Sequence, residues 1–178
     1  MFGWLKRNDK PDPVAGLHAR MVKAALEPAL YLHCGIEDSF EGRFESLSLH
    51  VFLVMRRLNT LPPPAPEMAQ ELVDRTFTGI DHTLRQIGIS DTKLPRKMKE
   101  LAGAFLGRVS AYDAALAATD DAGLEQALSR NALSGRDAGL LAEYVAAAAD
   151  HLAGLNLAQL LADAEIFPHL LMDEGQPT

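Results

Sequence analysis

Cysteine is almost absent from this chain of 178 residues, since Cys34 is the only thiol. An internal disulfide is therefore impossible, and a lone thiol fits a reducing compartment. The chain also lacks any apolar run near the roughly 20 residues that a membrane-spanning helix needs. Residues 1–7 contain neither the apolar stretch nor the small-residue cleavage site of a signal peptide. We therefore expect a cytoplasmic protein.

Basic side chains are scarce in the C-terminal part of the chain. Residues 1–108 carry 15 basic and 13 acidic groups, whereas residues 109–178 carry 2 basic and 11 acidic groups. The formal net charge is −7. Because nucleic-acid binding depends on clustered Lys and Arg, this balance argues against a general nucleic-acid binder and against DNA as a partner.

The usual motifs of catalysis and metal binding are missing as well. The sequence has no glycine-rich phosphate-binding loop followed by Lys and Ser or Thr, and no nucleophile elbow. No two histidines have the i, i+4 spacing of a helical zinc site. On a helix, the adjacent His33 and Cys34 would point about 100° apart and could not easily share one metal ion. We therefore expect no enzyme, no metal site and no cofactor.

Apolar residues recur at helical spacing along most of the chain, and Ala and Leu dominate over β-branched residues. Asp12 followed by Pro13 is a typical helix start. Pro28 should kink or divide the helix expected at residues 13–34 near Glu27. Ile87 continues the apolar stripe of the helix expected at residues 66–87. The expected helices span about residues 13–34, 40–59, 66–87, 93–118, 121–133, 134–153 and 156–167.

These patterns predict an all-α protein, a compact single-domain bundle of six or seven helices. We place the helical domain at residues 13–172, with flexible tails at residues 1–12 and 173–178.

Three stretches combine glycine, charge and aromatic residues in a way that packing alone does not require. Residues 30–45 read LYLHCGIEDSFEGRFE, and residues 81–91 read DHTLRQIGISD. The third stretch contains KMK at residues 97–99 and AFLGR at residues 104–108, followed by Tyr112. In this order and at these separations, the stretches resemble the ubiquinol–cytochrome c chaperone family. The resemblance covers about residues 17–131 and fades toward the acidic C-terminus.

The resemblance implies an assembly chaperone that binds cytochrome b, nascent or newly inserted, during biogenesis of ubiquinol–cytochrome c reductase. Mitochondrial relatives bind newly synthesised cytochrome b, act with a small helical partner protein and associate with the ribosome. The implied partners are therefore cytochrome b, a ribosome or an anionic membrane surface, and a small helical protein. The implied location is peripheral, at the inner face of the cytoplasmic membrane.

Charged residues within these stretches have a spacing that predicts ion pairs. Asp81 and Arg85 are at i, i+4 on one helix face. Arg108 shares a helix face with aromatic residues, so it needs a carboxylate partner or an open groove. We expect an ionic cluster that joins three helices and either fixes their register or contacts the client. The candidate residues of this cluster are Arg43, Glu45, His50, Asp81, Arg85, Asp91, Arg108 and Tyr112.

A run of basic residues precedes the third stretch. It is either a solvated helix face or a docking face for an anionic membrane surface or ribosomal RNA. Its residues are Lys93, Arg96, Lys97 and Lys99.

A chaperone for a membrane subunit needs an exposed apolar groove with a polar or basic rim on a rigid helical scaffold. Two alternatives to a chaperone stay open: a helical domain that binds haem or another small molecule, and a module that docks on the ribosome or RNA. The residues that either line the groove or form the core are Tyr31, Phe44, Phe77, Phe105 and Tyr112.

Overall fold

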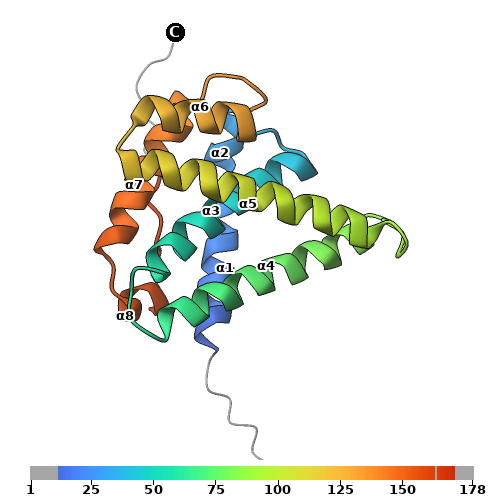
Figure 1. The fold of residues 1–178 in the computed structure, drawn as a ribbon, viewed down its shortest axis with the longest axis horizontal. Helices are drawn as coiled ribbons and strands as arrows, with labels where there is room; N and C mark the ends of the chain where they lie inside the picture. Colours follow the sequence, from blue (N-terminus) through green and yellow to red (C-terminus); the bar gives the residue numbers. More distant parts are fainter. Residues whose placement is uncertain (1–11, 163, 171–178) are drawn as a thin grey trace, which may run out of the picture.

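The computed structural model of the protein describes residues 12–162 and 164–170. This part of the chain forms eight helices and contains no strand (Figure 1), which confirms the predicted all-α class. Apart from Asp12, the expected N-terminal tail lies outside the described residues, as does the expected C-terminal tail. The helices are α1 (Pro13–Ala25), α2 (Pro28–Leu32), α3 (Phe40–Leu58), α4 (Ala65–Gln86), α5 (Leu94–Ala118), α6 (Asp121–Ala132), α7 (Gly139–Gly154) and α8 (Leu157–Leu161).

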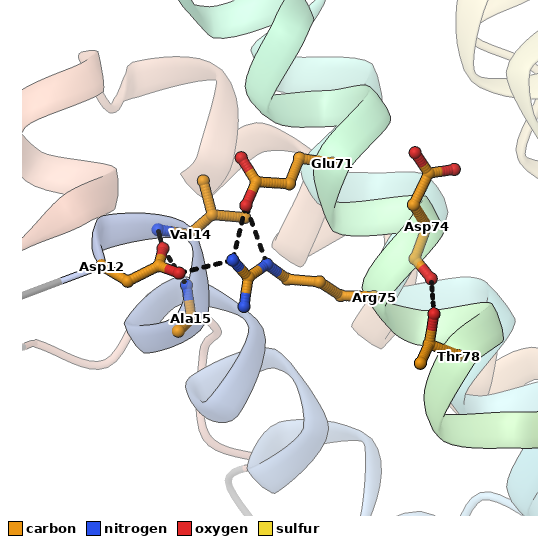
Figure 2. Close-up of polar contacts among 7 residues, drawn as sticks. All are labelled: Asp12, Val14, Ala15, Glu71, Asp74, Arg75 and Thr78. Carbon is orange, nitrogen blue, oxygen red and sulfur yellow. Dashed lines mark hydrogen bonds and ion pairs between the residues drawn. The ribbon is translucent and has the colours of Figure 1, made fainter. Parts of the chain in front are cut away.

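Helix α1 begins as its sequence predicts. The Asp12 carboxylate accepts hydrogen bonds from the backbone N–H groups of Val14 and Ala15 at 3.1 and 3.0 Å. Figure 2 shows that the same carboxylate contacts Arg75 of α4, which also pairs with Glu71 one turn earlier. The cap of α1 is thereby joined to α4.

Pro28 divides the first predicted helix, as expected. Leu26 is the C-cap residue of α1, and Pro28 occupies the first position of α2. Proline has no backbone N–H to continue the helical hydrogen bonds, so the chain turns at this point.

Helix α3 is the central element, since it packs against α1, α4, α5, α6 and α7. Its buried positions include the polar side chains of Ser46, Ser48 and His50. Ser46 is satisfied because its hydroxyl donates to the carbonyl oxygen of Ala25 at 2.7 Å. From Ser48 to Val54 every residue of α3 is buried, so this part of the helix is surrounded by its neighbours.

Helices α4 and α5 meet at one end of the molecule and separate toward the other (Figure 1). The segment 87–93 connects them and forms the apex of this V-shaped pair. Phe77 and Phe105 pack edge to face across the pair, with ring centroids 5.7 Å apart.

Two of the predicted helix boundaries toward the C-terminus are wrong. Helix α7 begins at Gly139 rather than near Ser134, whose φ of 54° is left-handed. The last helix ends at Leu161 instead of continuing to residue 167. Residues 164–170 are not helical, and Ile166 and Phe167 within them are buried. The free energy gained by burying these two side chains therefore exceeds that of forming another turn of helix.

Candidate functional site

Two of the predicted charged residues make ion pairs on the surface of the protein. Arg43 of α3 pairs with Asp38 at 2.8 Å, and both side chains are more than half exposed. Arg85 pairs with Asp81 at 2.8 Å, which confirms the i, i+4 contact, and also contacts Asp91. Surface pairs of this kind contribute at most about 1 kcal/mol each, because water competes for the charges.

The pair of Arg108 and Glu45 is different, because it is mostly buried and joins α5 to α3. The Arg108 side chain is 17% exposed and that of Glu45 is 11% exposed. Burial raises the pKa of Glu45, and Arg108 opposes that increase. Arg108 also lies over the ring of Phe44, 5.7 Å from its centroid. Glu45 is therefore the carboxylate partner that we expected Arg108 to need.

The predicted single ionic cluster is therefore wrong, because the ion pairs of its charged residues fall into three separate sets. Within the predicted cluster, Arg43 and Arg85 find a carboxylate within six residues along the chain, and Arg108 is the member that pairs with another helix. Tyr112, beside the Arg108 pair in sequence, is 1% exposed, and burial raises its pKa. A role of these residues in client binding stays a prediction.

His50, which was predicted to belong to the ionic cluster, lies inside the core instead. Its Nδ1 is 2.7 Å from the carbonyl oxygen of Ser46, and its Nε2 is 2.8 Å from the hydroxyl of Tyr144. The ring also packs edge-on against Phe167, with centroids 4.7 Å apart. Burial lowers the pKa of His50 to about 4, so the ring is neutral at physiological pH. Since His50 is 0% exposed, the folded protein offers no access to it.

The predicted basic residues lie at the start of α5 and in the turn before it, next to the apex. Arg96 pairs with Glu100 at 2.9 Å, and the Lys97 ammonium lies 6.0 Å from the centroid of the Phe40 ring. Lys93 and Lys99 are exposed. The face is therefore accessible, although two of its four charges also make contacts within the protein.

An open groove with a volume of about 420 Å³ lies between the end of α1, the first half of α3 and the end of α4. We call it the apolar groove. Its floor includes the buried residues Ala25, Phe44 and Ile80. The residues that line it are Val22, Ala25, Leu26, Asp38, Ser39, Phe40, Arg43, Phe44, Leu47, Ile80, Thr83 and Ile87.

Two large apolar side chains in the lining of the apolar groove are exposed to solvent. Leu26 is 49% exposed and Ile87 is 58% exposed, at the ends of α1 and α4 respectively. The sequence assigned Ile87 to the apolar stripe of its helix and did not single out Leu26. Their exposure could have been inferred from their position in the sequence, because each apolar residue directly follows the last turn of its helix.

The aromatic residues proposed for a groove separate into several positions. Phe44 lines the apolar groove, whereas Phe105 and Tyr112 are buried in the core at 5% and 1% exposure. Tyr31 and Phe77 are half-buried and lie outside the lining, and the Tyr31 hydroxyl donates to the carbonyl oxygen of Ala25 at 2.8 Å. An apolar groove is present as expected, but only Phe44 of the five predicted aromatic residues lines it.

A second cavity of about 340 Å³ lies between α1 and residues 164–170. Its lining is more highly charged, and Lys23 pairs there with Glu165 at 2.9 Å. Residues 164–170 cover part of α1 through this contact.

Across residues 12–162 and 164–170, no group of three or more His, Cys, Asp or Glu side chains lies close enough to hold a metal ion. None of the helices in this part of the chain is long and apolar enough to cross a membrane.

Comparison with known proteins agrees with the resemblance in the sequence. The model of the family described as ubiquinol-cytochrome C chaperone matches residues 32–167, and so extends into the acidic region where the resemblance was expected to fade. The crystal structure of the Cbp3 homolog from Brucella abortus is similar over 89% of this chain and 90% of that chain, with 36% identity and a TM-score of 0.80. No curated protein matches. The chain belongs to the ubiquinol–cytochrome c chaperone family.

Proposed function

We propose that the protein is an assembly chaperone that binds cytochrome b, nascent or newly inserted, during biogenesis of ubiquinol–cytochrome c reductase. Membership of the ubiquinol–cytochrome c chaperone family carries this proposal. The apolar groove supports it, because a chaperone must shield apolar segments of a membrane protein before they reach their final partners. Such shielding requires no catalytic group.

The proposed location is the inner face of the cytoplasmic membrane, with the protein bound peripherally. The basic residues near the apex of α4 and α5 support this location, because anionic lipids attract clustered Lys and Arg. Lys93 and Lys99 are exposed and suited to such contacts. A ribosome and a small helical partner protein are further predicted partners.

Affinity capture of the tagged protein tests the proposed function. The protein is expressed in its native host, crosslinked during respiratory growth, purified and analysed by mass spectrometry. We expect cytochrome b to be enriched over other membrane proteins of similar abundance. A tagged helical protein of another family serves as the control. Capture of the protein without cytochrome b, in cells that are making the reductase, would contradict the proposal.

A further inference from the structure

The lining of the apolar groove offers few polar groups to an occupant, and each of them already makes a contact within the protein. The Thr83 hydroxyl donates to the carbonyl oxygen of Gly79 at 3.0 Å, and the Ser39 hydroxyl accepts from the backbone N–H of Gly42 at 3.1 Å. The charges of Asp38 and Arg43 cancel in their own ion pair. A polar or charged side chain placed against the apolar part of this lining would lose its water without gaining a partner.

The backbone around the apolar groove is satisfied in the same way. Most lining residues belong to α1, α3 or α4, where backbone groups bond mainly within the helix, and none of them belongs to a strand. The two exposed caps follow the same rule, because the N–H groups of Leu26 and Ile87 donate to Val22 and Thr83. An extended peptide needs backbone partners from an open sheet edge. A helix brings its own backbone hydrogen bonds and needs only apolar contact.

The size and edges of the apolar groove fit the side chains of one helix face. Its volume of about 420 Å³ is that of a small ligand site. A helix bound in a groove inserts side chains spaced at i, i+3 or i+4, and i+7. Leu26 and Ile87 provide exposed apolar contact beside such side chains, above the buried floor. Covering both would remove from water two of the large apolar side chains that the fold leaves exposed.

We infer that the apolar groove binds one apolar, uncharged α-helix of the client, a segment of the kind that later spans the membrane. This inference rests on the proposed function and adds the face of the chaperone and the conformation of the bound segment. The groove selects against charge, because most of its lining is apolar and would desolvate a charged side chain without pairing it. The client helix is thereby held by side-chain burial alone, which allows its release to the assembling reductase.

Site-specific photo-crosslinking in the native host tests this inference. A photoreactive phenylalanine analogue replaces Leu26 or Ile87 in the full-length protein. The same analogue replaces Leu106 of α5 or Leu140 of α7 as matched controls, since these leucines are 65% and 55% exposed but lie outside the groove. We expect crosslinks from positions 26 and 87 to a membrane-spanning helix of cytochrome b, and none from positions 106 and 140.

A charge placed in the groove provides a second measurement. Ile87→Asp should lower the amount of cytochrome b captured about tenfold, because a carboxylate would be buried without a partner. Leu106→Asp should leave the amount unchanged, and thermal unfolding should confirm that both variants fold.

Three outcomes would overturn the inference while leaving the proposed function intact. Cytochrome b captured normally by Ile87→Asp, or crosslinked only from positions 106 and 140, would place the client on another face. Crosslinks from the groove to an extended loop of cytochrome b would refute the helical occupant. Crosslinks between two copies of this chain would make the groove a self-association surface. Failure of the wild-type protein to capture cytochrome b would instead refute the proposed function itself.

Discussion

At the scale of single residues, the Arg108–Glu45 pair is the strongest of the predicted charge contacts. Truncating one partner of a mostly buried pair leaves the other charge desolvated. We predict that Arg108→Ala lowers the free energy of unfolding by about 2–3 kcal/mol. Urea unfolding followed by circular dichroism measures this. Arg43→Ala is the matched control, since its exposed pair contributes at most about 1 kcal/mol.

The double variant Arg108→Met with Glu45→Leu tests the cause of that loss. Apolar residues of similar volume remove both charges and keep the packing, so unfolding should stay within about 1 kcal/mol of wild type. A double variant as unstable as Arg108→Ala would show that the pair stabilises through its charge interaction and not merely by neutralising a buried charge.

His50 gives the protein a pH dependence with a defined sign. The unfolded chain binds a proton at this residue below about pH 6.5, whereas the folded state does so only near its lowered pKa of about 4. The stability that comes from a neutral His50 is therefore complete above pH 6.5 and lost as the pH falls toward 4.

We accordingly predict that, between pH 7 and pH 5, the wild type loses about 2 kcal/mol more unfolding free energy than His50→Gln. Urea titrations of both proteins at the two pH values provide the comparison, in which the shared carboxylates cancel. Equal losses for the two proteins would mean that His50 is protonated within the fold.

At the scale of elements, helices were predictable where an apolar stripe runs between clear boundary signals. Helix α4 begins after the prolines at positions 62–64 and ends before Gly88, within one residue of the predicted range at either end. Prediction failed where tertiary burial sets the conformation. Apolar residues near the C-terminus favoured a helix to residue 167, but Ile166 and Phe167 are buried from a non-helical segment.

The placement of the non-helical segment at residues 164–170 should therefore depend on Phe167. This ring is 8% exposed and packs against His50. We predict that Phe167→Ala lowers the unfolding free energy by about 3 kcal/mol through the lost burial and the cavity left behind. Hydrogen exchange should speed up at residues 164–170 and leave the amides of α4 and α5 protected. The exposed Leu140→Ala should change stability by less than about 0.5 kcal/mol.

At the scale of the whole molecule, the resemblance to a chaperone family predicted an apolar groove, but the sequence did not predict where the groove lies. Phe44, Phe105 and Tyr112 all lie on helical stripes, and a stripe does not reveal whether another helix covers it. The packing of α1 and α4 along α3 leaves Leu26 and Ile87 uncovered, whereas the packing of α5 on α3 and α4 buries Phe105 and Tyr112. The charge distribution, in contrast, was readable directly, because the basic residues gather before and within the start of α5.

The proposed client groove and the proposed docking face are neighbours on the surface of the protein. The apolar groove and the basic start of α5 lie near each other, since Phe40 lines the groove and also contacts Lys97. A client helix in the groove would therefore be held close to residues suited to an anionic membrane surface. This arrangement fits the transfer of a membrane subunit better than permanent binding to a soluble partner.

The most direct test of the proposed chaperone function is a pulse-chase capture in the native host. Cells are labelled briefly during respiratory growth, and cytochrome b bound to the tagged protein is quantified at successive times. We predict that labelled cytochrome b is bound early and leaves the protein as it enters the assembled reductase. Labelled cytochrome b that never appears on the protein, or that stays bound after the reductase has assembled, would contradict an assembly chaperone.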